Sequence, residues 1–157
     1  MVQDGDKAPD FELPTDGGGT LGLSGLKGKP AVLYFYPKDD TSGCTVEARD
    51  FTRLAPDFRK AGVEVIGVSP DSVESHAKFR KKHGLAVRLA ADTDKAVAMA
   101  YGVWVEKSMY GRKYMGVERS TFLIDGKGRI ARSWRKVKVP GHAEQVLAAA
   151  RELRQQG

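Results

Sequence analysis

Short apolar segments alternate with amphipathic segments along most of the chain, and this alternation constrains the fold more than any other feature of the sequence. Residues 31–36 are almost continuously apolar, as in a strand that is buried on both faces. The next segment carries apolar side chains at steps of three and four residues, which is the spacing of one helix face. Further apolar segments at 63–68 and 87–90 are each followed by another helical segment. The pattern predicts an α/β fold in which helices cover a central, largely parallel β-sheet.

Two predicted hairpins complete this order and make the sheet mixed. Residues 11–13 and 20–23 flank a glycine-rich turn near the N-terminus, and residues 120–124 and 129–134 flank a second turn. Residues 103–118, which are rich in aromatic and basic side chains, are expected to form a long loop. Helices are predicted from about Cys44 to Ala61, from Ser69 to His83, from Asp92 to Tyr101, and from near Pro140 onward.

Length and composition indicate one ordinary globular domain, spanning residues 1–157. No stretch approaches the roughly 18 consecutive apolar residues of a membrane span, and the acidic, polar N-terminus is unlike a secretory signal, so we expect a cytoplasmic protein. The net charge of +6 raises the alternative of a nucleic-acid binder. However, the basic clusters alternate with acidic residues or fall at predicted helix ends, and no nucleic-acid motif is present. We therefore expect neither a membrane nor a nucleic-acid partner.

The sequence contains a single cysteine, Cys44, which limits the sites that the chain can build. One cysteine forms no internal disulfide and no cysteine-based zinc site. His76 and His83 lie about two helical turns apart and could share a face, but further ligands at suitable spacing are missing. We interpret both as exposed helix histidines and expect no metal.

Cys44 lies where the first buried strand is followed by a helix. Sites in open α/β sheets form just beyond the carboxyl ends of the strands. A cysteine in the first helical turn also lies at the positive end of the helix dipole, which favours thiolate over thiol. A lone cysteine is often only a small buried apolar residue, so the position by itself leaves both interpretations open.

The neighbours of Cys44 carry a family resemblance. Pro37, Thr41 and Cys44 form the pattern Pro-x-x-x-Thr-x-x-Cys, the signature of peroxiredoxins. Residues 34–45, 101–104, 107–111 and 116–125 resemble the bacterioferritin-comigratory (PrxQ) subfamily, and the similarity extends from Asp10 to the last helix. The resemblance implies a thioredoxin-like fold, which is one of several α/β folds that suit the alternating pattern. It also implies a thiol-dependent peroxidase.

The resemblance assigns a role to each matching residue. The Cys44 thiolate attacks the terminal oxygen of hydrogen peroxide or an organic hydroperoxide, water or an alcohol leaves, and a sulfenic acid remains. Arg119 stabilises the thiolate and donates hydrogen bonds to the peroxide oxygens, and the Thr41 hydroxyl contacts sulfur or peroxide. Pro37 rigidifies the loop and shields the sulfur from water. No cofactor is needed, because sulfur itself changes oxidation state. The ordinary alternatives are a surface arginine, a capping threonine and a proline that only ends a strand.

Three further residues are weaker candidates. Glu47 comes one helical turn after Cys44 and could hold Arg119 in place, although a solvent-facing helix glutamate is an equally good interpretation. Trp104 and Tyr110 lie in the predicted loop and could line the substrate entrance, although aromatic residues in loops often only anchor packing.

The sequence departs from the subfamily where many members carry a resolving cysteine, five residues after the first one. Arg49 occupies that position, and the next helix has no cysteine either. The sulfenic acid must therefore be reduced by an external thiol such as thioredoxin, glutaredoxin, a small thiol, or Cys44 of a second chain. Ser42 also replaces a proline that is common in the family. We expect a monomer or a weak homodimer.

Two other functions use the same cysteine. A thiol–disulfide oxidoreductase needs a second cysteine, and the segment Cys44-Thr45-Val46-Glu47 lacks one. A peroxide-sensing redox switch or binding protein, in which oxidation of Cys44 alters partner binding, stays open as the alternative.

Overall fold

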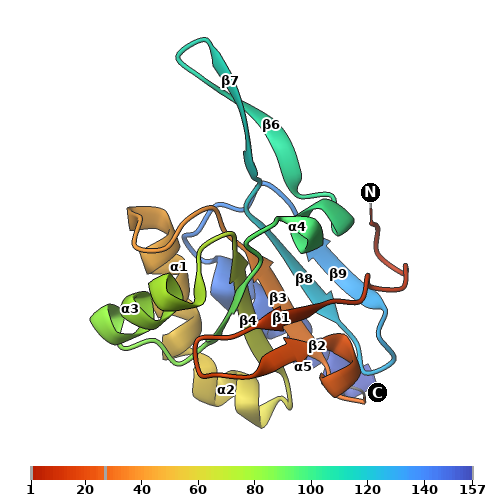
Figure 1. The fold of residues 1–157 in the computed structure, drawn as a ribbon. Coiled ribbons are helices and arrows are strands. Elements are labelled where there is room, and N and C mark those ends of the chain that lie inside the picture. The colour runs from red at the N-terminus through yellow and green to blue at the C-terminus, as the bar shows by residue number, and fades with distance from the viewer. Residues whose placement is uncertain (1, 27, 157) are drawn as a thin grey trace.

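A mixed five-stranded sheet forms the centre of the molecule, with strand order β5-β4-β3-β8-β9 (Figure 1). The computed structural model describes residues 2–26 and 28–156. β3 pairs with β4 and β4 with β5 in parallel, whereas β8 runs antiparallel to both β3 and β9. This confirms the predicted mixed sheet. Its strands are β3 (Ala31–Phe35), β4 (Glu64–Ser69), β5 (Arg88–Ala91), β8 (Ser120–Ile124) and β9 (Ile130–Trp134).

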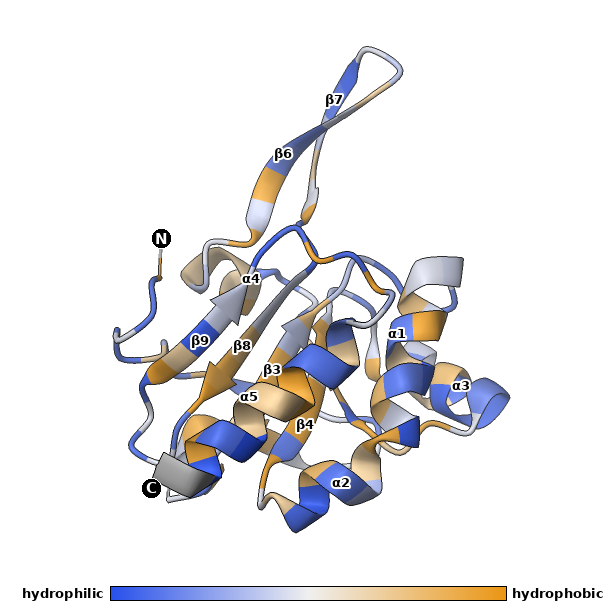
Figure 2. Cartoon of the chain, turned by 180° about the vertical axis from the view of Figure 1, so that it is seen from behind, coloured by the Kyte–Doolittle hydropathy of each residue, from blue (hydrophilic) through white to orange (hydrophobic). Residues whose placement is uncertain are grey.

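The two faces of the sheet are covered by different elements. Because side chains alternate along a strand, Val32 and Tyr34 of β3 face one apolar cluster, and Leu33 and Phe35 face the other. The first cluster includes residues of α1, α2, α3 and α5, and Figure 2 shows α1, α2 and α5 with mixed polar and apolar surfaces on that side. The second is closed by α4 and by the N-terminal hairpin of β1 and β2. These elements are α1 (Ser42–Arg53), α2 (Ala55–Lys60), α3 (Val73–His83), α4 (Ala96–Ala100), α5 (His142–Gln156), β1 (Glu12–Pro14), β2 (Thr20–Gly22) and the 3-10 turn η1 (Leu23–Leu26).

The prediction of a long loop between α4 and β8 is wrong. Residues 103–118 instead contain an antiparallel hairpin of β6 (Trp104–Met109) and β7 (Arg112–Val117), which projects beyond the end of the sheet at which β8 begins (Figure 1). Tyr110 and Gly111 form its two-residue turn, both with positive φ, at 52° and 77°. Such a turn favours Asn-Gly, and most side chains of the hairpin are exposed, so neither the turn nor an apolar alternation indicated strands.

Several helix boundaries also differ from the prediction, for local reasons. The first predicted helix is split at Leu54 because Pro56 has no N–H and its ring crowds the preceding turn. α3 begins after Ser72, whose side chain accepts a hydrogen bond from the Ser75 amide at 3.1 Å, and not at Ser69. Asp92 lies before α4 and accepts hydrogen bonds from the Val97 and Ala98 amides of that helix. α5 begins at His142, just after Pro140.

No helix in the described part of the chain is both long and apolar enough to cross a bilayer.

Candidate active site

The strand pairing brings Cys44 and Arg119 together although they lie far apart in the sequence. Cys44 is in the first turn of α1, just beyond the carboxyl end of β3. Arg119 directly precedes β8, whose first residue, Ser120, pairs with the last residue of β3, Phe35. Both side chains therefore lie at the same end of the sheet, which is where sites form in α/β folds.

The guanidinium of Arg119 joins two acidic groups. Its Nη2 donates to Cys44 Sγ at 3.2 Å, and its Nη1 donates to Glu47 Oε1 at 2.6 Å. Cys44 and Glu47 are each only 1% exposed, and the Arg119 side chain is 17% exposed. Burial opposes the charge of Arg119, but Glu47 and Cys44 outweigh it and raise the pKa of the guanidinium. The expected contact of Arg119 with sulfur is present, and a solvent-exposed arginine is ruled out.

Glu47 is buried beneath the guanidinium and does not face solvent. Burial raises its pKa to about 7, although Arg119 acts in the opposite direction. Its Oε2 atom has no hydrogen-bond partner among the described residues. The carboxyl group therefore lies close to the balance between its neutral and ionised forms at neutral pH.

Gly43 is a part of the site that the sequence analysis missed. A Cβ atom at this position would lie 3.2 Å from Arg119 Nη2, which is tighter than ordinary contact. The absence of a side chain lets the guanidinium approach the start of α1. The amides of the first turn of α1 also have no partner within the helix, so they are available to an anion at the sulfur.

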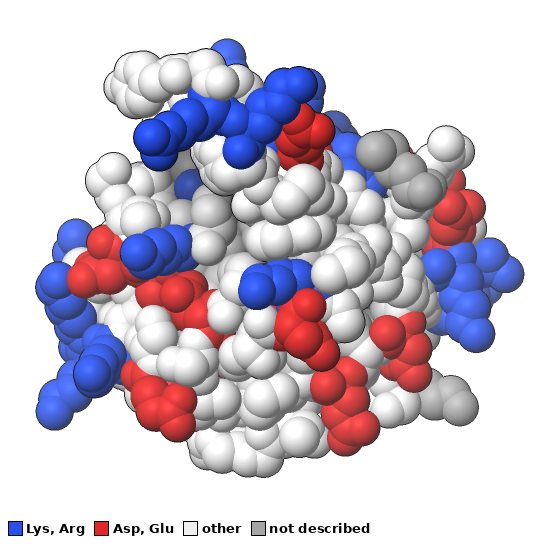
Figure 3. All heavy atoms as spheres, turned by 45° about the horizontal axis from the view of Figure 1, so that its top comes forward, with Lys and Arg blue, Asp and Glu red and all other residues white. Residues whose placement is uncertain are grey.

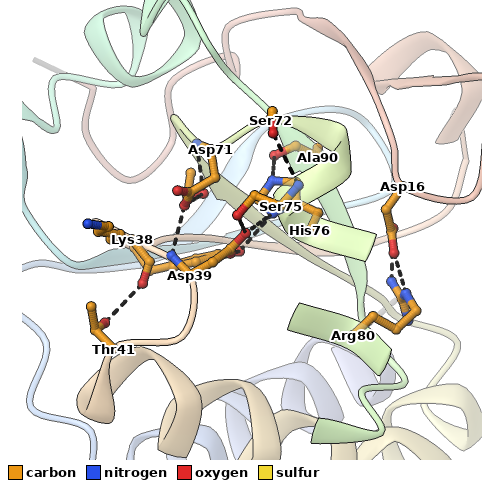
Figure 4. Close-up of polar contacts among 12 residues, drawn as sticks. Asp16, Lys38, Asp39, Thr41, Asp71, Ser72, Ser75, His76, Arg80 and Ala90 are labelled. Carbon is orange, nitrogen blue, oxygen red and sulfur yellow. Dashed lines mark hydrogen bonds and ion pairs between the residues drawn. The ribbon is translucent and has the colours of Figure 1, made fainter. Parts of the chain in front are cut away.

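Thr41 and Pro37 form the loop between β3 and α1. The Thr41 hydroxyl donates to the Lys38 carbonyl at 2.9 Å, as Figure 4 shows, and its own carbonyl accepts the Thr45 amide at 2.8 Å. Thr41 is the N-cap residue of α1 but makes no side-chain cap. Pro37 is half-buried, two residues after the end of β3. The structure thus places both residues in the loop that leads to Cys44, with the threonine hydroxyl turned toward backbone and not toward sulfur.

The two aromatic candidates lie at opposite ends of the β6–β7 hairpin. Trp104 is half-buried at its base, packs against the second apolar cluster and has the Lys95 ammonium 5.7 Å from its ring centre. Tyr110 is 98% exposed at the tip. Six residues of strand separate the tip from the base, about 20 Å. The structure therefore does not bring Tyr110 to Cys44.

A buried polar cluster holds the loop between β3 and α1 against α3 (Figure 4). Asp39 accepts hydrogen bonds from Tyr36 Oη at 2.6 Å and Ser75 Oγ at 2.8 Å, and its Oδ2 lies 2.7 Å from His76 Nδ1. The Asp39 amide donates to Asp71 at 2.8 Å. The expectation of an exposed His76 is wrong, because this ring is fully buried between Asp39 and the Ala90 carbonyl.

The same cluster has the composition of a cation site. Ligand atoms of Asp39, Asp71 and His76 lie within 4.8 Å of one another. Protein donors already occupy both oxygens of Asp39, from Tyr36 and Ser75, and Oδ2 of Asp71, from Ser69 at 2.6 Å. We interpret the cluster as a structural hydrogen-bond network. His83, the other histidine expected to be exposed, is 17% exposed and contacts Asp40 at 2.7 Å.

His142 is a further neighbour of the site that the sequence did not indicate. It begins α5, is 4% exposed, and its Nε2 lies 2.8 Å from Thr121 Oγ1 on β8. Burial, with a smaller contribution from Arg119, lowers its pKa to about 4. This histidine is therefore neutral at pH 7.

The surface around the hairpin carries both signs of charge. Figure 3 shows Lys and Arg side chains gathered over the hairpin, with Asp and Glu side chains spread below them on the same face. Lys107, Arg112 and Lys113 are the hairpin cations, and Lys113 lies 3.7 Å from Glu106. The face shown is not the continuous positive surface that nucleic-acid binding uses.

The fold and the site together define a class: a thioredoxin-like α/β protein with a buried cysteine, held against an arginine, at the start of a helix. Residues 5–133 match the AhpC/TSA family. The chain is 51% identical over 146 residues to "Putative peroxiredoxin bcp" of Coxiella burnetii, covering 93% of this chain and 97% of the relative. It is 49% identical over 152 residues to "Peroxiredoxin Bcp" of Bacillus subtilis, covering 97% of each.

A solved structure extends the similarity to three dimensions. It shows the bacterioferritin comigratory protein of Xanthomonas campestris, studied for its alkyl peroxide reduction activity, with a TM-score of 0.88 and 47% identity over 92% of each chain. The chain therefore belongs to the AhpC/TSA family and, within it, to the Bcp (PrxQ) peroxiredoxins, which are thiol-dependent peroxidases.

Proposed function

We propose that Cys44 is the residue that this peroxidase oxidises, and that its substrates are hydrogen peroxide and organic hydroperoxides. The observation that carries the proposal is the 3.2 Å contact between Arg119 Nη2 and Cys44 Sγ at a sulfur that is 1% exposed. A fixed cation that contacts the sulfur stabilises its negatively charged form, and the thiolate is the nucleophile. Alkyl peroxide reduction by the Xanthomonas relative supports organic hydroperoxides as substrates.

The chemistry is a displacement at oxygen. A lone pair of the Cys44 thiolate forms a bond to the terminal oxygen of ROOH, the O–O bond breaks, and its electrons leave with RO⁻. That anion takes up a proton and departs as an alcohol, or as water when the substrate is hydrogen peroxide. Cys44 is left as a sulfenic acid. Arg119 and the first amides of α1 stabilise the negative charge that moves from sulfur to oxygen.

The loop residues take supporting roles in this proposal. Rotation about one bond turns the Thr41 hydroxyl from the Lys38 carbonyl toward the peroxide, where it donates a hydrogen bond. Pro37 stiffens the segment that carries Thr41. Two observations support these roles: both residues lie in the loop that leads to Cys44, and both belong to the same sequence signature as Cys44.

An external thiol regenerates the enzyme. Since the chain has one cysteine, the sulfenic acid condenses with an external thiol to give water and a mixed disulfide, and a second thiol then releases Cys44. We propose thioredoxin or glutaredoxin as the thiol donor and a monomer or weak homodimer as the working form. A cytoplasmic location fits this dependence, because that compartment keeps thiols reduced.

Peroxide turnover tests the proposal. Wild-type protein should consume hydrogen peroxide and an alkyl hydroperoxide when a thioredoxin or glutaredoxin system is supplied, and Cys44→Ser should consume neither. Thr45→Ser, which changes the neighbouring residue, serves as the control and should keep the activity. Slow oxidation without turnover would overturn the proposal and favour the peroxide-sensing alternative.

A further inference from the structure

One guanidinium serves two ionisable groups in the site. Arg119 donates through Nη1 to Glu47 and through Nη2 to Cys44, at 2.6 Å and 3.2 Å. Cys44 and Glu47 also lie one turn apart on the same helix and are equally buried, at 1% exposure each. The arrangement has one fixed positive charge for two groups that can each become negative.

The buried environment does not favour two negative charges beside one positive charge. With both groups ionised, the trio carries a net charge of −1 in a region with little water, and desolvation of an uncompensated charge is unfavourable. With one proton on either acidic group, the trio is neutral. Because both acids contact the same guanidinium, ionisation of one opposes ionisation of the other.

The unpaired oxygen of Glu47 is where such a proton fits. Glu47 Oε1 accepts the Arg119 hydrogen bond, whereas the buried Oε2 has no partner in the described part of the chain. A protonated Oε2 leaves the Arg119 contact in place. The site therefore has a vacant position for one proton next to the guanidinium that holds the sulfur.

We infer that Cys44 and Glu47 share one proton across Arg119, so that Glu47 takes the proton when Cys44 becomes a thiolate and returns it to the leaving oxygen of the peroxide. The inference rests on the proposed role of Cys44 as the peroxidase nucleophile. It gives Glu47 a function beyond holding Arg119 in position.

The proton balance closes within the site. Ionisation moves the proton from Cys44 to the Glu47 carboxylate, giving a thiolate and a neutral carboxyl group. Attack on ROOH transfers oxygen to sulfur and leaves RO⁻, which takes the proton from Glu47. The products are sulfenic acid, ROH and an ionised Glu47, and no proton has been drawn from bulk water. General acid assistance of this kind matters most when the leaving anion is strongly basic.

Tyr34 and His142 do not replace Glu47 as the proton holder. Burial raises the pKa of Tyr34 and lowers that of His142, so both are neutral at pH 7. Asp50 raises the pKa of Glu47, which favours its protonated form. The remaining charged groups near these residues are Asp39, beyond Tyr34, and Lys107 and Glu118, beside Arg119 and Cys44.

Leaving-group dependence distinguishes proton supply from a structural role. Glu47→Gln keeps an oxygen for Arg119 but cannot release a proton. We expect its rate constant for an alkyl hydroperoxide, which leaves as a basic alkoxide, to fall at least about 10-fold. A peroxycarboxylic acid leaves as a stable carboxylate, so its rate constant should change little. An equal fall for both substrates would show that Glu47 only positions Arg119.

Glu144→Gln is the matched control, because it makes the same acid-to-amide change at an exposed glutamate that also pairs with an arginine, Arg53, at 2.8 Å. Both substrates should react with this variant as with wild type. If instead wild type consumes no peroxide, or Cys44→Ser still does, the proposed function fails and not this inference alone.

A second measurement uses wild-type protein and so does not depend on the folding of a variant. Infrared spectra near pH 6 should show the carbonyl band of a protonated carboxyl group that is absent in Glu47→Gln. Alkylation of Cys44 with iodoacetamide prevents the sulfur from becoming an anion, so Glu47 no longer competes with Cys44 for the charge of Arg119. The band should then weaken, because the carboxyl group ionises. A band that is unchanged by alkylation would contradict the shared proton.

Discussion

At the residue scale, the planar fork of Arg119 matters as much as its charge. Two nitrogens of one rigid group reach Glu47 and Cys44 at the same time. A lysine carries the same charge as a single point on a flexible stem and cannot reproduce this geometry.

We therefore expect Arg119→Lys to lower the rate constant for peroxide by roughly 100-fold, the loss typical when one donor to a developing charge is removed. Stopped-flow measurement of peroxide consumption checks this. Arg112→Lys makes the same change on the exposed hairpin and should have no effect. A variant at Arg119 that reacts like wild type would show that charge alone is sufficient.

The sequence predicted the residues of the site that a local motif defines. Cys44, Thr41 and Pro37 belong to one short signature, and Glu47 follows at the spacing of one helical turn. His76 was predicted to be exposed because its helix is polar, with Glu74, Lys78 and Lys81 close by in sequence. Its burial comes from Asp39, which is 37 residues away. Helix composition carries no information about such a distant contact.

At the scale of elements, the Asp39 cluster joins the cysteine loop to α3. Both ring nitrogens of His76 face acceptors, since Nε2 lies 3.0 Å from the Ala90 carbonyl and Nδ1 lies 2.7 Å from Asp39. Because a carbonyl only accepts hydrogen bonds, Nε2 is the donor to Ala90. Hydrogen bonds to Asp39 thus join the loop that precedes Cys44 to α3.

Removing Asp39 should destabilise the protein strongly. Asp39→Ala leaves the Tyr36 hydroxyl, Ser75 Oγ and His76 Nδ1 without their buried acceptor, a change that typically lowers the free energy of unfolding by about 3 kcal/mol. Urea denaturation monitored by circular dichroism measures it. Asp40→Ala removes exposed contacts to Lys82 and His83 and should cost much less. Equal losses in the two variants would contradict a structural role for the buried cluster.

The β6–β7 hairpin offers a test of the predicted substrate entrance. Tyr110 occupies a turn position with a φ of 52°, which asparagine adopts more readily than tyrosine. Since Tyr110 lies at the tip, we expect Tyr110→Asn to keep wild-type rates with hydrogen peroxide and with a bulky organic hydroperoxide, and to stabilise the turn slightly. A higher KM for the bulky substrate alone would show that the hairpin tip folds over the site in solution.

At the scale of the whole molecule, the alternation of apolar and amphipathic segments was sufficient to predict the layered sheet. Apolar runs mark the strands because β3, β4 and β8 are covered on both faces. The hairpin was missed because most of its side chains lie outside the core. The split after Arg53 was missed because the apolar stripe continues from Phe51 through Leu54 to Phe58 across it. The pattern of apolar residues thus predicts the elements that pack in the core and says little about the elements that are exposed.

Two buried groups near the site make the stability of the whole molecule depend on pH in opposite directions. His142 has a folded pKa of about 4 against an ordinary value of 6.5, so the unfolded chain binds its proton first as the pH falls. Its contribution is complete above pH 6.5 and is lost as the pH falls toward 4. Glu47 has a folded pKa of about 7 against an ordinary 4.5, so the folded chain binds its proton more tightly. Its contribution is complete below pH 4.5 and is lost as the pH rises through 7.

Single substitutions should separate these two slopes. We expect Glu47→Gln to remove a loss of stability on the order of 2 kcal/mol between pH 4.5 and pH 7, so that the variant gains on wild type as the pH rises. His142→Gln should remove a loss of similar size between pH 6.5 and pH 4, so that this variant gains on wild type as the pH falls. Urea denaturation at half-unit steps from pH 4 to pH 8 measures both. Because the two windows overlap between pH 4.5 and pH 6.5, the slopes partly cancel in wild type and become visible only in the variants. Parallel pH profiles for wild type and both variants would show that neither group is held away from its ordinary protonation state by the fold.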